Sequence, residues 1–426
     1  MQTCINTITK GVSAFHVVNY VKEELLQTGF QELKLTGNWQ LEEEKNYLLS
    51  PYPSMLIAVS VGKLNTQSQI RLSVAHTDSP CLKVKANADM PDKEYIRMNV
   101  EPYGGLLKHT WFDRPLGMAG KVVLRGADAF HPQVRYVDSK TAIGTIPSLA
   151  PHLSRGSETK EIQVQQELIP IIGLAGEEMT AGHIKEYLET HMNVKRSDIL
   201  NYDLFLYPTD KPVITGLKNE LLQAPRIDNL ASVAAMLEAM QKLSGSRHNN
   251  LAIAVMFDNE EIGSRSKQGA DSVLLQKVLE KLGRGLRQEP EHWQDMLAEG
   301  FLLSMDGAQG HHPNYPDKSD PTNQVYLGKG IVIKTSASQR YLSDSTAAAI
   351  VIGLCEQEKI PWQQQVNRSG MPGGQTLGPL VAAYLPMLGV DIGIPMLAMH
   401  SANELAACAD YQALKQLVTA YYTYSA

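Results

Sequence analysis

The sequence predicts an α/β fold in which helices cover both faces of a mixed β-sheet. Its 426 residues are 43% hydrophobic and 20% charged, an ordinary composition for a globular protein with a sizeable core. From about residue 221 onward, short apolar runs alternate with segments whose apolar residues recur at helical spacing. Continuous apolar runs are typical of strands buried on both faces, and strands that alternate with helices form parallel or mixed sheets.

The N-terminal part of the chain predicts one helix followed by strands. Residues 14–29 carry apolar side chains at helical spacing, and Gly29 fits the end of this helix. The apolar runs 55–61 and 69–75 are typical of strands, and the second leads into a turn-like segment at 76–80.

A second, β-rich domain is expected as an insertion in the first. Between about residues 89 and 216, short strand-like pieces alternate with loops, and a charged helical segment follows at 181–194. This stretch holds few candidate metal ligands. The predicted domains are 1–90 joined with 219–426, and the inserted 91–218.

The C-terminal part predicts the alternation of strands and helices that defines the fold class. The expected strands are 251–257, 301–305, 330–335, 360–366 and 390–399. The expected helices are 229–243, about 270–283, 343–358, 377–388 and one that closes the chain.

Composition excludes several classes of protein. The formal net charge is -6, without the basic bias that nucleic acid binding requires. No apolar stretch approaches the ~20 residues of a membrane span, and the N-terminus lacks the layout of a secretory signal. The four cysteines show no paired spacing. We expect a cytoplasmic protein that binds neither nucleic acid nor membrane.

Metal-ligand side chains stand just past the ends of the predicted strands. Four apolar strands are each followed by an imidazole or a carboxylate, and one further carboxylate opens a helix: His76, Glu261, Asp306, His400 and Asp228. Open α/β sheets bind ligands at the carboxyl edge of their strands. Since neighbouring buried carboxylates need cations to neutralise them, the sequence predicts a metal pair at this edge.

The residue types narrow the chemistry of this site. Two imidazoles and three carboxylates suit Zn, Co or Mn better than Ca or Mg. Two such ions, ~3.5–4 Å apart, can activate a water molecule and polarise a carbonyl group. A general base must still accept the proton of the water, and Glu260, adjacent to a candidate ligand, suits that role. Asp78 is placed to accept the other ring N–H of His76.

Taken singly, each candidate residue has a simpler explanation. His76 could be a surface residue before a turn, and the acidic segment 258–261 could be a solvated helix start. Asp228 could cap the helix that follows it, and Asp306 could be a turn residue. All of these explanations would have to hold together, which favours the metal site.

At these residues the sequence resembles the aspartyl aminopeptidase family of zinc metallopeptidases. The resemblance runs over essentially the whole chain, in motifs that include AHTDSPCLKVK (75–85), WFDRPL (111–116), RIDNLAS (226–232), DNEEIGS (258–264) and MHSANEL (399–405). It implies a zinc-exopeptidase catalytic domain interrupted by a β-rich dimerisation domain. It also implies dimers or tetrahedral dodecamers, and removal of N-terminal Asp or Glu from peptides.

The resemblance further implies how the ligands are shared between two divalent ions, Zn with Co or Mn as alternatives. His76 and Asp306 would hold one ion, Glu261 and His400 would hold the other, and Asp228 would bridge them.

Four more roles come from the resemblance. Glu260 matches the general base and Asp78 the aspartate of the H-x-D motif. His152 matches a histidine that reaches the active site of a neighbouring subunit. Lys334 matches a lysine that faces the acidic side chain of the substrate. Without the resemblance, the sequence is also compatible with simpler interpretations. His152 could be a histidine of a surface loop, and Lys334 could be a lysine of an edge strand that faces solvent.

The sequence departs from the family near the substrate pocket. Gln309 replaces a histidine, and Gly370 and Gly373 replace an aspartate and a cysteine of the Gly-rich loop 370–378. The ligands and Glu260 are unaffected. A broader aminopeptidase with the same mechanism therefore stays open beside the acidic preference.

Other classes of function are less compatible with the sequence. There is no G-x-S-x-G motif of a serine hydrolase and no H-E-x-x-H motif of a single-zinc protease. The Gly-rich loop lacks the G-K-[ST] of a phosphate-binding loop. A non-catalytic metal-binding scaffold would not need Glu260, because binding a metal requires no base.

Overall fold

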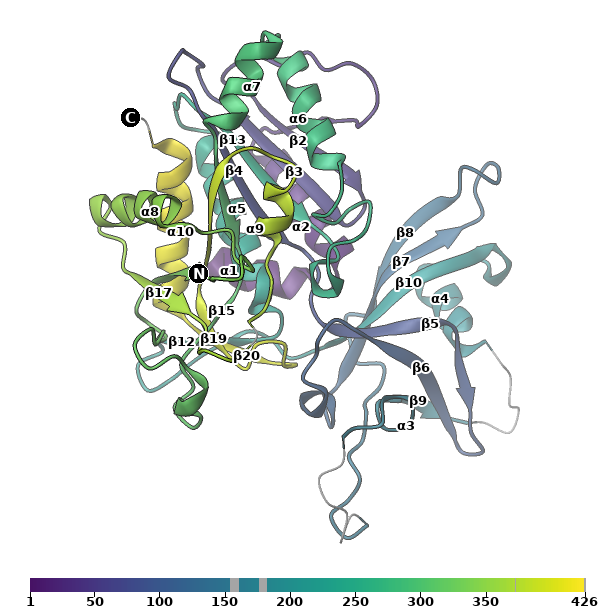
Figure 1. The fold of residues 1–426 in the computed structure, drawn as a ribbon. Coiled ribbons are helices and arrows are strands. Elements are labelled where there is room, and N and C mark those ends of the chain that lie inside the picture. Colours follow the sequence, from purple (N-terminus) through teal and green to yellow (C-terminus); the bar gives the residue numbers. More distant parts are fainter. Residues whose placement is uncertain (154–160, 176–181, 372, 425–426) are drawn as a thin grey trace. The chain divides into compact units, whose positions relative to one another are not determined.

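The computed structural model describes residues 1–153, 161–175, 182–371 and 373–424, which form a mixed α/β fold as the sequence predicts (Figure 1). The chain divides into two compact units. The first comprises Met1–Asp78, Pro212–Met399 and Glu404–Ala426, and the second comprises Ser79–Lys211 with His400–Asn403.

The first unit is built on a nine-stranded mixed sheet with the order β1-β2-β3-β13-β4-β14-β18-β16-β17. Its strands are β1 (Gln31–Leu33), β2 (Asn46–Tyr52), β3 (Met55–Val61), β4 (Ile70–His76), β13 (Leu251–Phe257), β14 (Phe301–Met305), β16 (Ile331–Thr335), β17 (Trp362–Val366) and β18 (Leu388–Gly393).

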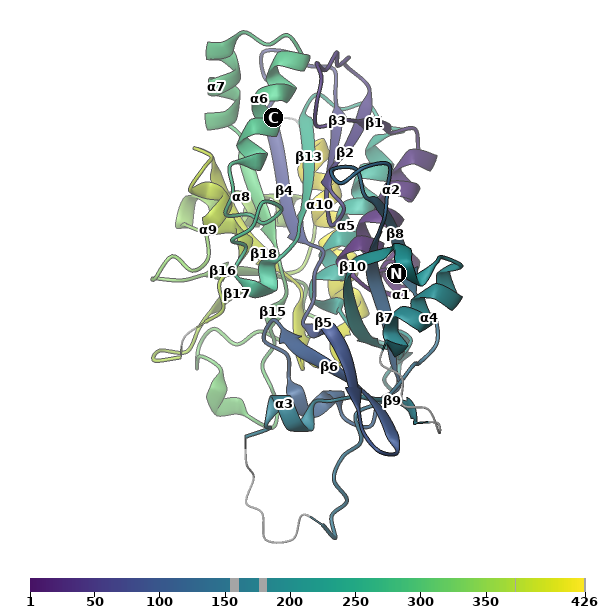
Figure 2. The same ribbon diagram turned by 90° about the vertical axis from the view of Figure 1, so that its right-hand side faces the viewer.

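Helices cover both faces of this sheet because its strands are apolar on both sides. In β13, Ala252, Ala254 and Met256 join one hydrophobic cluster, and the alternate residues join another. The helices of the first cluster are α1 (Gln2–Lys10), α2 (Ala14–Gln27), α5 (Ile227–Leu243), α8 (Ser345–Gln357) and α10 (Cys408–Thr423). Those of the second are α6 (Leu274–Gly285), α7 (Pro290–Ala298) and α9 (Leu377–Ala382). Figure 2 shows α5 and α10 on one side of β4 and β13, with α6, α7 and α9 on the other.

A smaller sheet completes the first unit, with the order β11-β12-β20-β19-β15. Its strands are β11 (Val213–Thr215), β12 (Leu221–Ala224), β15 (Ala308–Gln309), β19 (Pro395–Leu397) and β20 (Glu404–Ala407).

Two predictions for the C-terminal part were wrong in detail. The run 390–399 is not one strand, because β18 ends in the large sheet and β19 belongs to the small one. His400 therefore follows a strand of the small sheet. The helix expected over 377–388 ends at Ala382, and Leu388 already begins β18. Pro386, which lacks an N–H group, lies in the segment between them.

The second unit holds a six-stranded antiparallel sheet with the order β8-β7-β10-β5-β6-β9. Its strands are β5 (Cys81–Pro91), β6 (Tyr95–Tyr103), β7 (Leu116–Leu124), β8 (Gln133–Asp138), β9 (Ile171–Leu174) and β10 (Ile199–Pro208), and its helices are α3 (Val164–Glu167) and α4 (His183–Met192). The unit begins earlier than the expected boundary at 91, because β5 pairs with β6 and β10.

None of the helices in the described ranges combines the length and apolarity needed to cross a bilayer. None of the four cysteines, all within the described ranges, forms a disulfide bond, and Cys4 and Cys355 are buried.

Candidate metal centre

Three neighbouring strands bring candidate ligands to one edge of the large sheet. β4 lies between β13 and β14 and runs parallel to both. β4 ends at His76, β14 ends one residue before Asp306, and β13 leads into a 3₁₀ turn at Glu260–Ile262. Since the carboxyl ends of parallel strands meet at one edge, these side chains converge.

His76 lies between two carboxylates at a spacing that fits a shared metal ion. Its Nε2 is 3.4 Å from Oδ1 of Asp228 and 3.4 Å from Oδ1 of Asp306. These distances lie at the long end of the range for hydrogen bonds. They match the ~3.3–3.4 Å that separates two ligands of a tetrahedral Zn²⁺ with bonds of about 2.0–2.1 Å. The donor set of His76, Asp228 and Asp306 therefore fits zinc.

Glu260 and Glu261 complete a second group around the same imidazole. One donor atom from each glutamate and one from His76 all lie within 4.8 Å of one another. Both glutamates come from the turn after β13, where Asn259 and Gly263 at its ends have positive φ angles. This turn places adjacent carboxylates beside the candidate ligands.

Asp78 connects His76 to that turn. The Nδ1 atom of His76 is 3.0 Å from the main-chain oxygen of Asp78 and 3.4 Å from its Oδ1. The carboxylate of Asp78 accepts the main-chain N–H groups of Glu260, at 3.2 Å, and Glu261, at 3.1 Å. Asp78 thus orients the ring so that Nε2 faces the other ligands, and it also holds the glutamate turn, which the sequence did not reveal.

Asp228 is held by contacts that the sequence analysis missed. Its peptide bond with Asn229 is cis, and its ψ angle of 110° is not helical. Its N–H group donates to Oε2 of the buried Glu404 at 2.9 Å, and Nδ2 of Asn229 donates to the Met305 oxygen at 2.8 Å. Asp228 is therefore held at the centre through its own main-chain N–H group and through the side chain of its neighbour Asn229. The signal for Glu404 was its place in the motif 399–405.

Burial and the closeness of several carboxylates shift the pKa values of Glu260 and His76. Burial raises the pKa of Glu260 to about 8; the charge of His76 opposes this shift, and Asp306, Asp78 and Asp228 add to it. Burial lowers the pKa of His76, but hydrogen bonding to Asp228, Asp306 and Asp78 outweighs it, so the pKa lies well above its usual value. A bound cation relieves such crowding of carboxylates.

Two predicted site residues lie in the second unit. His400 has a φ angle of 66°, and its main-chain oxygen accepts the N–H of Leu107 at 2.9 Å. Its Nδ1 is 3.2 Å from the Gly105 oxygen. His152 is exposed, and residues 154 and 155 at the end of the segment IPSLAPHLSR (146–155) lie outside the described residues. The roles of His400 and His152 stay predictions.

Lys334 is not the solvent-facing lysine that a simpler explanation allowed. It is only 2% exposed, and its Nζ donates to the Gly307 oxygen at 2.8 Å. The three departures from the family pattern differ in setting: Gln309 is an exposed residue of β15, Gly370 has a positive φ angle, and Gly373 lies beside the Asn367 side chain. Residue 372 of the Gly-rich loop lies outside the described residues.

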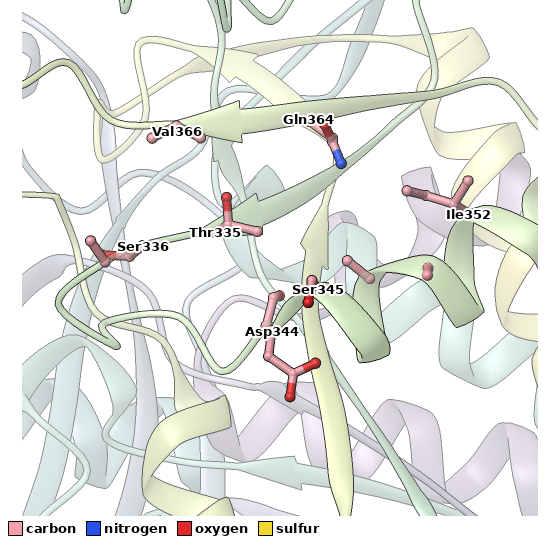
Figure 3. Close-up of a pocket in the computed structure, with 11 residues that line it drawn as sticks. Thr335, Ser336, Asp344, Ser345, Ile352, Gln364 and Val366 are labelled. Carbon is pink, nitrogen blue, oxygen red and sulfur yellow. The ribbon is translucent and has the colours of Figure 1, made fainter.

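A separate pocket of about 400 Å³ lies near the end of β16 (Figure 3). Figure 3 shows Thr335 and Gln364 on the neighbouring strands and Asp344 at the start of α8. Asp344 caps that helix by accepting the Ala347 N–H group. Since Lys334 and Thr335 are adjacent in a strand, their side chains point to opposite faces. This pocket therefore lies on the other face of β16 from Lys334.

Comparison with known proteins identifies relatives along nearly the whole chain. Residues 7–422 match the family model described as aminopeptidase I zinc metalloprotease (M18). A probable M18 family aminopeptidase 2 from Clostridium novyi (strain NT) is 38% identical over 411 residues, which cover 96% of this chain and 94% of the relative. A similarly named protein of Pseudomonas aeruginosa (strain UCBPP-PA14) is 36% identical over 429 residues, covering 100% and 98%.

Solved structures share the fold. A chain in the cryo-EM structure of the Ape4 and Nbr1 complex has a TM-score of 0.93 at 29% identity, covering 99% of this chain and 86% of that one. The M18-family aminopeptidase of Thermotoga maritima has a TM-score of 0.83 at 22% identity, covering 98% and 94%.

Proposed function

The chain belongs to the M18 family of zinc metallo-aminopeptidases and has their zinc-exopeptidase-like fold, and we propose that it uses two zinc ions to remove N-terminal Asp or Glu residues from peptides. The observation that carries the proposal is His76 Nε2, 3.4 Å from both the Asp228 and the Asp306 carboxylates, beside Glu260.

The proposed reaction assigns one task to each side chain. His76 and Asp306 would hold one ion, Glu261 and His400 the other, and Asp228 both. When bound, the ions would lower the pKa of a water molecule and polarise the peptide carbonyl. Glu260 would accept a proton from this water as its oxygen attacks the carbonyl carbon, and would deliver the proton to the amine that leaves when the C–N bond breaks. Asp78 supports this task, since its carboxylate accepts the Glu260 N–H group.

The proposed preference for acidic residues depends on Lys334. Its ammonium group has three N–H donors, of which one is used by the Gly307 oxygen. The others suit a substrate carboxylate. A broader preference is the second candidate, and the substitutions at Gln309, Gly370 and Gly373 favour it.

We further propose that the enzyme is cytoplasmic and assembles as a dimer or a tetrahedral dodecamer through the second unit. Within such an assembly, the exposed His152 would reach the active site of a neighbouring subunit.

Hydrolysis of aminoacyl chromogenic substrates by zinc-loaded enzyme tests the proposal. We expect turnover of the Asp and Glu compounds to exceed that of Leu, Ala and Lys compounds, and a chelator to abolish it. Turnover mainly of neutral compounds would replace the acidic preference with the broader one. Absence of turnover with every compound would leave a metal-binding scaffold.

A further inference from the structure

A buried lysine and a buried aspartate lie beside the turn that carries Asp306. Lys334 and Asp391 are directly opposite on the antiparallel strands β16 and β18, so their side chains share one face of the sheet. Lys334 is 2% exposed and Asp391 is 0% exposed. Buried charges are stable only when opposite charges and hydrogen bonds replace the lost water. Both side chains therefore need partners inside the protein.

The ammonium group of Lys334 finds its partners at the metal-ligand turn. Its Nζ donates to the main-chain oxygen of Gly307 at 2.8 Å and lies 5.4 Å from the centre of the Tyr341 ring. Gly307 directly follows Asp306. The lysine is thus bonded to the backbone one residue away from a candidate metal ligand.

Three further hydrogen bonds restrain the turn that contains Asp306 and Gly307. The N–H groups of Asp306 and Ala308 donate to main-chain oxygens at and just past the end of β18, at 3.0 and 2.9 Å. The Gly307 N–H donates to Oδ1 of Asp306 at 2.7 Å. That same oxygen faces Nε2 of His76. The strand fixes both sides of the turn, and Lys334 fixes the carbonyl between them.

Asp391 supplies the opposite charge for Lys334. Its Oδ2 accepts the Leu342 N–H, and its own N–H donates to Oγ of Ser343 at 2.8 Å. Burial raises the pKa of Asp391, and the positive charge of Lys334 counteracts this rise. Asp391 is therefore fixed in place and attracts the ammonium group on the face of the sheet where it reaches Gly307.

We propose that Lys334 and Asp391 are positioning residues that hold the Asp306–Gly307 turn in the geometry that binds metal. The inference rests on the proposed function, because it takes Asp306 as a metal ligand. It is separate from any contact between Lys334 and a substrate carboxylate, since an ammonium group has three donors.

Zinc affinity, measured by chelator competition without substrate, tests this role. Lys334→Met keeps the length of the side chain but cannot donate to Gly307. We expect it to bind zinc roughly 10–100-fold more weakly than wild type, the usual effect of losing a group that orients a ligand. Lys329→Met, at an exposed lysine just before β16, should bind zinc like wild type. Wild-type affinity in Lys334→Met would overturn the proposal.

A double variant separates positioning from general instability. Lys334→Met removes the positive charge that offsets the burial of the Asp391 carboxylate, which destabilises the fold by itself. In Lys334→Met/Asp391→Asn both charges are gone, so the thermal midpoint of the metal-free protein should recover while zinc affinity stays weak. Recovery of wild-type zinc affinity would overturn the positioning role.

Failure of the positioning role can be distinguished from failure of the proposed function. A wild-type protein that binds zinc but hydrolyses no aminoacyl substrate would refute the proposed function alone. The zinc affinities of the variants would still decide the positioning role, because no substrate enters that measurement.

Discussion

At the scale of single residues, two adjacent glutamates have different proposed tasks. Glu260 and Glu261 belong to one 3₁₀ turn, and Asp78 accepts the main-chain N–H group of each. The turn is therefore held by its backbone, which leaves both carboxylates to act on their surroundings. A substitution at either side chain should change its chemistry without releasing the turn.

Glu260→Gln should keep its zinc and lose most of its turnover. An amide cannot accept the proton of the attacking water, and loss of a general base lowers rates by about 10²–10⁴-fold. Metal content and kcat on an acidic substrate check this prediction. Glu261→Gln is the matched control, because it should lose zinc affinity as well. Loss of zinc from Glu260→Gln would show that Glu260 is a ligand instead.

Metal removal should make stability depend on pH. In the metal-free protein the pKa of Glu260 is raised from 4.5 to about 8, and that of His76 is raised above 6.5. Each group binds its proton more tightly in the folded protein than in the unfolded chain, so protonation of either group stabilises the folded state. The stabilisation by Glu260 is complete below about pH 4.5 and is lost as the pH rises through about 8, and that by His76 is complete below about pH 6.5 and is lost as the pH rises through its raised pKa. The thermal midpoint of the metal-free protein should fall across this range, less steeply in Glu260→Gln.

Zinc binding should release protons from the site. The raised pKa values leave donor groups protonated in the metal-free protein, and zinc binds these groups only in their unprotonated form. Titration calorimetry near pH 7, in two buffers of different ionisation enthalpy, measures the number released. Net uptake of protons would contradict the assigned acidities.

At the scale of elements, the centre depends on how closely β18 approaches the turn after β14. A Cβ atom added at Gly393 would lie 1.7 Å from the main-chain oxygen of Asp306. Only glycine permits this approach. The strand therefore sets the position of the ligand turn through its backbone as well as through Asp391.

Gly393→Ala should weaken zinc binding and lower the thermal midpoint, because β18 and the Asp306 turn must separate. Gly353→Ala in α8 is the matched control, since its added Cβ meets no atom within 4 Å. That change should stabilise the protein by about 0.5–1 kcal/mol, the helix preference for Ala over Gly. Unchanged zinc affinity in Gly393→Ala would argue against strict positioning by the strand.

At the scale of the whole molecule, the proposed role of His152 implies that two subunits contribute residues to each active site. His152 is exposed in the second unit. If a neighbouring subunit completes each active site with this residue, two different inactive variants should complement one another.

Mixing inactive His152→Ala with inactive Glu260→Gln, followed by dissociation and reassembly, should restore activity. Random exchange in dimers would leave roughly a quarter of the sites with both residues intact. Each variant taken alone through the same treatment is the control. Failure to recover activity in verified mixed oligomers would place His152 outside the shared site.

The features that depend on the local pattern of apolar residues could be predicted from the sequence. The apolar runs 251–257 and 301–305 are strands with the predicted bounds. The positions of Glu260 and Asp306 beyond strand ends followed from these runs, and the run 69–75 predicted that His76 stands at the end of its strand. Burial on both faces leaves such runs continuously apolar, so their pattern is visible without a partner.

The sheet that each strand joins, and the distant side chains that support the ligands, could not be predicted and are known from the folded structure. The run 390–399 is divided between two sheets whose strands look alike in sequence. The hydrogen bond from Asp228 to Glu404 and the pairing of Lys334 with Asp391 each join residues that are far apart in the chain. Strand pairing and buried polar contacts are chosen by the packing of the whole core. The spacing of apolar residues within one segment therefore does not determine these contacts.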